Sequence, residues 1–363
     1  MRLYRVTLFA LAAAAATALP AFAQPGSPTP PAADPASALG KDSPWLLAPV
    51  FSSNPKLGTS LGALAGYLHY FDEKSRPSIF GLTAQYSTTN SMVGGAIARA
   101  SFDEDRQRVI AGMVYGNVKN DYDDYLGTGI PLKNEAQMRG LIGRYTYRIK
   151  DDWFAGVQGI KQNFSIAGDS AFDQTVLDIL GVQSYKSAGL GLVLQNDSRD
   201  DENLPTRGAL FNLNNMAFRE GLGGQDDYDV YRLEGRYFHP FGQGNVLALR
   251  QLNHLTHDAP AAARAPVQLR GYKVGQYTGQ YMSSFEAETR LRLAERWTAT
   301  VFAGIACLYG DGQDCTDKDS LFPAGGAGVQ YILKPKEGIV LNLELADGLG
   351  SNFGAYLKMG YAY

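Results

Sequence analysis

Apolar and polar residues alternate along most of the chain, and this pattern restricts its fold more than any other feature. In residues 284–293 the two alternating sets are Phe285, Ala287, Thr289, Leu291 and Leu293, and Glu286, Glu288, Arg290 and Arg292. A period of two places the sets on opposite faces of a β-strand. Rows of Arg and Glu suit the aqueous lumen of a membrane barrel, with the apolar face toward lipid. A soluble sandwich would also alternate, but its solvent face would favour Lys, Thr and Ser.

The alternating segments number about sixteen, each close to the length of a tilted membrane strand, about 9–11 residues. They span residues 45–53, 59–71, 78–89, 91–103, 108–118, 136–149, 153–166, 185–196, 208–219, 228–240, 245–257, 282–293, 297–309, 322–333, 339–346 and 353–363. An even number closes an antiparallel barrel with both termini on one side. Mostly short turns then lie on one side, and the long loops lie on the other, near 119–135, 167–184, 220–227, 258–281 and 310–321. The predicted fold is an all-β, 16-stranded antiparallel transmembrane β-barrel.

The N-terminal residues differ in composition from the rest of the chain. Residues 1–23 carry Arg2 and Arg5, then an Ala-rich run and the Ala-x-Ala sequence that ends at Ala23, which predicts a signal peptide cleaved there. A retained membrane anchor is the alternative. Residues 24–43 are rich in proline and predict a disordered leader. The barrel is expected over residues 44–363, in the bacterial outer membrane and in contact with its lipid.

Charge and composition argue against other classes of protein. The net charge is -3, and it becomes -5 without residues 1–23, which hold two arginines and no acid. A nucleic-acid partner is not expected, because binding to phosphates requires an excess of Lys and Arg. The 41 glycines and 21 tyrosines are unusual for a soluble α/β enzyme.

Several short motifs have the letters of a functional site but lack its context. Residues 58–62 match G-x-S-x-G without a following helix, and residues 189–191 match part of a nucleotide-binding motif inside a strand. His254 and His257 would point to opposite faces of a strand, so they cannot share a metal ion. The acidic stretch 311–319 lacks the ligand spacing of a calcium loop. We expect no enzymatic activity, no metal and no cofactor.

The two cysteines, Cys307 and Cys315, lie eight residues apart. An exported protein meets an oxidising compartment, so a disulfide that closes a small loop is predicted. Two unpaired thiols are the alternative.

Three segments resemble the BamA/TamA-like outer-membrane assembly superfamily, also called the bacterial surface antigen family. "LRGY" (Leu269, Arg270, Gly271 and Tyr272) is similar to a loop motif of that family. "DSRDDENLPTRG" (197–208) is similar to one of its turns, and "FGAYLKMGYAY" (353–363) to its closing strand. The opening segment, residues 49–71, resembles the first hairpin of the family. The resemblance covers residues 45–363.

The resemblance implies a long loop that folds into a sixteen-stranded barrel, where Arg270 pairs with acidic groups on nearby strands. The family usually places an Asp on the thirteenth strand, and at the matching position this sequence has Gly304. We therefore expect Glu286 or Glu288 as the partner of Arg270, with Glu288 favoured. In the closing strand, the resemblance implies an assembly signal, read by the outer-membrane assembly machinery, with Leu357, Met359, Tyr361 and Tyr363 on one face.

The resemblance also implies a function without catalysis. A barrel of this kind would assist the insertion or passage of protein or lipid, through lateral opening of a weak seam between its first and last strands. A passive pore and a structural surface-antigen barrel are the alternatives. Family members carry periplasmic domains ahead of the barrel, whereas this chain has about twenty leader residues there. The expectation is a barrel-only member that acts with a separate periplasmic protein.

Overall fold

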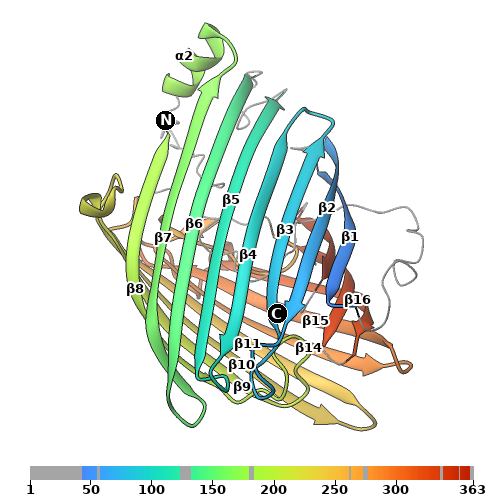
Figure 1. Cartoon of the computed structure of the whole chain (residues 1–363). Helices are drawn as coiled ribbons and strands as arrows, with labels where there is room; N and C mark the ends of the chain where they lie inside the picture. Colours follow the sequence, from blue (N-terminus) through green and yellow to red (C-terminus); the bar gives the residue numbers. More distant parts are fainter. Residues whose placement is uncertain are drawn as a thin grey trace.

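The structure of the chain is a computed structural model, and it describes most of the predicted barrel. The described residues are 43–54, 58–122, 132–179, 184–260, 263–272, 277–335, 338–350 and 352–359. The predicted signal peptide and almost all of the predicted leader lie outside them. Figure 1 shows long tilted strands that curve around a barrel, with the helix α2 (Ala171–Ile179) beyond one end of the wall.

One antiparallel sheet of sixteen strands forms the wall, and each strand pairs with its neighbour in the chain. Its first eight strands are β1 (Trp45–Asn54), β2 (Gly58–His69), β3 (Ser78–Ser87), β4 (Met92–Phe102), β5 (Gln107–Tyr122), β6 (Leu132–Lys150), β7 (Trp153–Gly168) and β8 (Tyr185–Asp197). The other eight are β9 (Gly208–Phe218), β10 (Tyr228–Phe241), β11 (Asn245–His257), β14 (Tyr281–Arg292), β15 (Trp297–Tyr309), β16 (Leu321–Lys334), β17 (Ile339–Gly348) and β18 (Phe353–Met359). The predicted fold class and strand number are confirmed.

The connections are short at one end of the barrel and long at the other. The long ones include α2, the 3-10 helices η3 (Glu220–Leu222) and η5 (Lys318–Ser320), and a loop between β11 and β14. That loop contains the two-stranded sheet of β12 (Ala265–Pro266) and β13 (Thr278–Gly279). We refer to the end with the short turns as the periplasmic end. Within the described residues, no helix combines the length and apolar character needed to cross a membrane.

Two long loops predicted from the sequence contain regular structure instead. Both ends of the loop predicted near 119–135 are strand, because β5 and β6 stay paired out to Tyr122 and Leu132. The loop predicted near 167–184 contains α2, whose Val176 and Leu177 are buried. Alternation does not detect these extensions, since they project beyond the lipid and no longer have one apolar and one polar face.

The side chains follow the predicted division between two faces. The largest exposed apolar side chains in the middle of strands include Leu82, Leu141, Leu192, Val301 and Leu345. Their neighbours in sequence point inward, and two of them, Thr300 beside Val301 and Glu344 beside Leu345, are almost fully buried. In a membrane barrel the exposed apolar band contacts lipid, and the inward face lines the lumen.

Aromatic rings border this apolar band. At the periplasmic end, the Trp45 and Tyr67 rings have centroids 4.9 Å apart, and those of Trp297 and Tyr331 lie 4.8 Å apart. At the opposite end, Tyr281 and Tyr309 lie 5.3 Å apart. Trp and Tyr prefer the boundary between hydrocarbon and water, so the two groups mark the height of the membrane-spanning wall.

The closing strand is described in part. Leu357 and Met359 belong to β18, but the positions of their side chains lie outside the described residues, as do Tyr361 and Tyr363. The assembly signal assigned to these four residues therefore stays a prediction.

The exposed band predicts a specific sensitivity to charge. Val301 is 55% exposed near the middle of β15, so Val301→Arg would place a guanidinium in the hydrocarbon layer. We expect a loss of about 2–4 kcal/mol in the free energy of unfolding. Denaturant titration of the barrel folded in lipid vesicles measures it. The matched control is Leu222→Arg, in η3 outside the wall, where the loss should be within about 0.5 kcal/mol. Equal losses for the two variants would contradict the lipid-facing assignment.

Candidate functional site

The loop between β11 and β14 turns into the lumen, and a short sheet holds its base together. Ala265 pairs with Gly279 and Pro266 with Thr278 in the β12–β13 ladder. The Val267 N–H also donates to the Tyr277 carbonyl at 2.9 Å. The ladder brings the two sides of the loop together, so that residues 269–272 project from its far end.

Arg270 lies at the tip of this loop and contacts three carboxylates. Its Nε lies 3.1 Å from Oε2 of Glu286 and its Nη2 lies 3.1 Å from Oε1, so the two side chains form a bidentate pair. Its Nη1 lies 2.7 Å from a Glu288 oxygen and 3.3 Å from a Glu344 oxygen. The guanidinium also lies over the Phe302 ring, 3.4 Å from its centroid. Arg270 therefore contacts both predicted partners, and the favoured Glu288 makes the shortest ion pair.

The local sequence explains why the acids reach the lumen. Glu286 and Glu288 are separated by one residue on β14, so both side chains point inward. Both are buried, as is Arg270. A buried charge is costly unless a partner and hydrogen bonds compensate it, so this group of charges depends on all its members.

Gly304 leaves no space for the acid that the resemblance places there. It is the cross-strand partner of Glu286. A Cβ at this position would lie 2.8 Å from the Phe285 carbonyl oxygen and 3.0 Å from the Leu269 Cδ1. The leucine of the loop motif thus packs against the glycine. From β15, Phe302 contacts the guanidinium with its aromatic face, so this strand supplies a ring in place of a carboxylate.

Glu344 is the member of the site that the sequence reasoning missed. It lies on β17 with Asn342 and Ala346, all three nearly inaccessible. The alternation that places Glu286 in the lumen also applies to "NLELAD", and this signal could have found Glu344. What the pattern cannot supply is its height in the barrel relative to Arg270, which depends on the strand registers between β14 and β17.

Gly271 and Tyr272 attach the loop tip to the last strands. Gly271 has a φ of +97°, a conformation that a side chain would strain, and its N–H donates to the Tyr356 hydroxyl at 2.9 Å. The Tyr272 hydroxyl donates to the Pro323 carbonyl at 2.7 Å and accepts from the Leu349 N–H at 2.9 Å. These bonds reach β16, the end of β17 and β18.

An apolar cluster supports the same loop. Its buried members are Leu252, Ala265, Val267, Leu269, Tyr272, Met282, Ala306, Leu308 and Phe322. They come from the loop and from β11, β14, β15 and β16. The loop is therefore packed as well as ion-paired, which fixes the position of Arg270.

The second motif, residues 197–208, forms the turn between β8 and β9 at the periplasmic end. Asp197 accepts from Arg199 at 2.7 Å, from Arg76 at 2.8 Å and from Arg108 at 3.0 Å. Asp200 accepts backbone N–H groups from Asp201, Thr206 and Arg207, which shapes the turn. Gly208 has a φ of +100°, and a Cβ there would lie 2.2 Å from the Ser198 carbonyl oxygen.

The two motifs meet at Glu288. Arg290 donates from Nη1 to the Pro205 carbonyl at 2.8 Å and from Nε to a Glu288 oxygen at 3.0 Å. Arg270 contacts the other oxygen of Glu288. A continuous series of polar contacts therefore runs through the lumen from the inward loop to the periplasmic turn.

Acidic groups at the periplasmic end are held in their charged form. Burial would raise the pKa of Glu202, but the nearby Arg99 and Arg76 outweigh it and lower this pKa to about 2. Burial likewise opposes ionisation of Asp105, yet its hydrogen bonds from Arg108 keep the pKa below the usual range. While they are ionised, Asp105 stabilises the turn between β4 and β5, and Glu202 stabilises the turn between β8 and β9.

The histidines and the acidic stretch considered as metal-site candidates make other contacts in the structure. His254 is buried in the lumen wall, whereas His257 is exposed and lies 3.3 Å from Asp258. Asp311, in the acidic stretch, pairs with Arg264 of the inward loop at 2.8 Å. In the part of the chain that the structure describes, no group of three His, Cys, Asp or Glu side chains is arranged to hold a metal ion.

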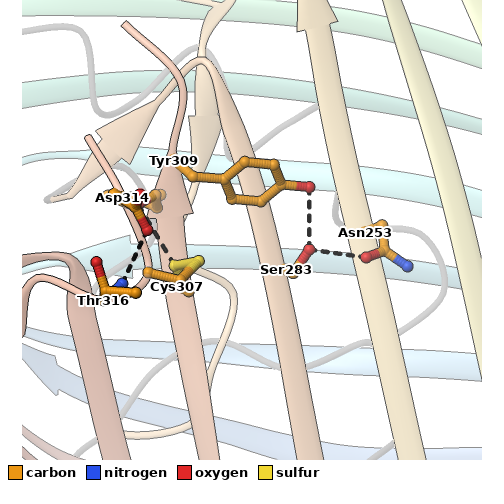
Figure 2. Close-up of a disulfide and its surroundings, with 8 residues drawn as sticks. Asn253, Ser283, Cys307, Tyr309, Asp314 and Thr316 are labelled. Atoms are coloured by element: carbon orange, nitrogen blue, oxygen red, sulfur yellow. Dashed lines mark hydrogen bonds between the residues drawn. A yellow bond between two sulfur atoms is a disulfide. The ribbon is translucent and has the colours of Figure 1, made fainter. Parts of the chain in front are cut away.

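Cys307 and Cys315 form a disulfide in the structure, with Cα atoms 5.6 Å apart. Figure 2 shows the bridge between the end of β15 and the loop that follows it. In the same view, the Tyr309 hydroxyl lies 3.2 Å from that of Ser283, which in turn donates to Asn253 at 2.7 Å. The disulfide ties the 310–320 loop to the wall beside the base of the inward loop.

The ion-pair geometry predicts the effects of substitutions. Arg270→Ala leaves Glu286, Glu288 and Glu344 close together, and we expect a loss of about 3–5 kcal/mol in stability. Glu344→Gln, which removes the negative charge at the longest of the three contacts, should cost less. The fraction of folded barrel in heat-modifiability gels, followed against denaturant, measures both. Arg207→Ala, at an exposed position, is the control. Wild-type stability in Arg270→Ala would refute a stabilising role for the loop.

The lowered pKa of Glu202 predicts a pH dependence. Its folded pKa lies below the ordinary value of 4.5, so its contribution is complete above pH 4.5 and is lost as pH falls toward about 2. We expect Glu202→Gln to be about 1–3 kcal/mol less stable than wild type at neutral pH. The difference should shrink as the pH is lowered through this window. A difference that stays constant in denaturant titrations down to pH 2 would contradict the assignment.

Comparisons with known proteins agree with this architecture. A family model described as the Omp85 superfamily domain matches residues 76–330. BamA from Haemophilus ducreyi lacking POTRA domains 1–3 is similar in structure, with a TM-score of 0.55 at 12% identity over 88% of this chain and 69% of that one. A search of the curated proteins gave no match.

Two CdiB structures are also similar. CdiB from Acinetobacter baumannii has a TM-score of 0.60 at 10% identity, and CdiB from Escherichia coli has 0.59 at 10%. Each match covers 87% of this chain, which spans 59% and 62% of the two CdiB chains. Identities this low establish the fold alone, whereas the family model matches more than half of the sequence. The chain is therefore an outer-membrane β-barrel that belongs to the Omp85 superfamily.

Proposed function

We propose that this barrel assists the insertion or passage of protein or lipid at the outer membrane, through lateral opening between β1 and β18. The observation that carries the proposal is the attachment of the inward loop to the last strands. Arg270 contacts β14 and β17, while Gly271 and Tyr272 bond to β18 and β16. The loop thus braces the strands on one side of the seam as a unit.

The other side of the seam contacts this unit mainly through apolar packing, with one hydrogen bond from Lys334 Nζ of β16 to the Ser43 carbonyl just before β1. Leu46 of β1 and Leu68 of β2 pack with Ile339 at the start of β17 in a small buried cluster. Apolar packing has no directional requirement, so such a contact separates at lower cost than a buried ion pair that loses one partner. Lateral opening requires that β1 can separate while β18 keeps its position, and the contacts of the inward loop favour this arrangement.

A crosslink across this cluster tests the proposal. Leu46→Cys with Ile339→Cys would join β1 to β17 under oxidising conditions. In a deletion strain of the source bacterium, we expect wild-type protein to restore outer-membrane protein levels and lipid asymmetry. The oxidised double variant should fail, and a reductant should rescue it. Each single variant is the matched control, because it alters the same packing without the link.

Two alternatives are distinguished by their own measurements. A passive pore is favoured by the polar lumen, and large steady conductance of the wild-type barrel in planar bilayers would support it. A lumen occupied by the braced loop predicts small, flickering currents instead. A deletion strain with normal outer-membrane protein levels, permeability and lipid asymmetry would favour a structural barrel and contradict the assembly role.

The partners belong to the same proposal. Insertion of the barrel itself would require the outer-membrane assembly machinery, which would read the closing strand. Its work on other molecules would involve a separate periplasmic protein that delivers them to the periplasmic end. The proposed mechanism is a change of conformation, and it assigns no catalytic role to any residue.

A further inference from the structure

Four arginines line the lumen beside the Arg270 site. Arg232 and Arg236 lie on β10, Arg250 lies on β11, and Arg144 lies on β6. We call them the lumen arginine cluster. Arg236 and Arg250 are direct cross-strand partners, an arrangement that is unfavourable for two like charges unless something compensates it.

One carboxylate lies inside this cluster. Glu234 accepts from Arg236 Nη2 at 2.8 Å and from Arg250 Nε at 3.0 Å, and both contacts use the same oxygen. It also attracts Arg232 and Arg144, and Arg232 is repelled by the other three arginines. Four guanidiniums share one carboxylate, so three positive charges are in excess at this wall.

The acids of the Arg270 site do not remove the excess. Glu286 faces Arg250 across the β11–β14 pair, but it also forms the bidentate pair with Arg270. Taken together, the two groups contain the arginines 144, 232, 236, 250, 270 and 290 and the glutamates 234, 286, 288 and 344. Six guanidiniums against four carboxylates leave two positive charges in the middle of the lumen. The whole chain, in contrast, has a net charge of -3.

Two members of the cluster have neutral hydrogen-bond partners. Arg144 donates from Nε and Nη2 to the Gln158 amide oxygen, at 3.1 and 2.7 Å. Arg232 donates to the amide oxygen of Gln268, on the inward loop, at 3.1 Å. An amide oxygen satisfies a donor but does not neutralise a charge, so these guanidiniums favour an anion nearby.

Polar atoms beside Arg232 lack partners among the described residues. The Gln268 Nε2, a donor, has none, and neither has the Nδ1 of His254. His254 is the cross-strand partner of Arg232, and only 5% of it is exposed. A buried donor without an acceptor is costly, and an oxyanion between the wall and the loop would supply one to Gln268 Nε2 and, in the tautomer with a proton on Nδ1, to His254.

We propose that the lumen arginine cluster binds a phosphate group. Guanidinium forks match the oxygens of phosphate in geometry and charge, and one dianion would neutralise the two excess charges. The site lies between the wall and the inward loop, which provides Gln268. The group could be free inorganic phosphate or the head group of an anionic lipid. The proposal concerns a ligand of the lumen and stands independently of the assembly role.

Thermal melting of the purified, folded chain in detergent tests the site. The wild type should show a saturable rise in melting temperature with millimolar inorganic phosphate, relative to sodium chloride at equal ionic strength. Short-chain phosphatidic acid should be compared with phosphatidylcholine of the same chain length. A response to the lipid alone identifies a head-group site, and a response to both probes identifies a general phosphate site. If neither probe stabilises the wild type, the proposal is wrong.

Substitutions separate the site from general effects of salt. Arg144→Gln combined with Arg232→Gln should weaken half-saturation at least about tenfold, equivalent to about 1.4 kcal/mol of binding free energy. Arg207→Gln, which removes an exposed arginine, should leave the response unchanged. An equal response in both variants would assign the effect to exclusion of phosphate from the protein surface and overturn the site. If the double variant fails to fold, Arg232→Lys replaces it, because it keeps the charge but loses the fork.

Discussion

A guanidinium placed in a confined lumen needs carboxylates, and much of this barrel is organised around that requirement. Arg270 has three of them, from two strands, and a ring from a third. The cost of an uncompensated charge is larger than the net value of the ion pairs themselves. The interaction therefore contributes less as a source of stability than as a constraint on which loop and strand positions fit together.

The charges in the lumen are arranged in groups with different balances. The periplasmic end has Asp105, Asp197 and Glu202 among arginines that keep them ionised. The Arg270 site has more carboxylates than arginines, whereas the lumen arginine cluster has the reverse. An acidic protein thus encloses a lumen with a positive centre. Because fields are focused where the walls have a low dielectric constant, an anion in the lumen would meet a more positive potential than the net charge of the chain implies.

Much of this structure could be predicted from alternation alone. The period of two identified the strands and the inward orientation of Glu286 and Glu288, because neither depends on distant residues. It did not identify α2 or the full length of β5 and β6, where the lipid-facing pattern stops. Glu344 and the contacts of Arg290 with Pro205 depend on strand register and on the path of a turn, which are properties of the whole barrel. Gly304 was recognised as a missing acid, but only the packing of Leu269 explains why a glycine lies there.

The shared carboxylate of Glu288 has a consequence for how the two ends of the lumen behave together. Arg270 holds one of its oxygens from the loop above, and Arg290, which also holds the Pro205 carbonyl below, holds the other. Residues that share one partner are energetically coupled. A substitution of Arg270 therefore also changes the charge that Arg290 meets at Glu288, and through Arg290 it reaches the turn at Pro205. Variants of the loop and of the turn are thus expected to have non-additive effects on stability, although their residues are far apart in the sequence.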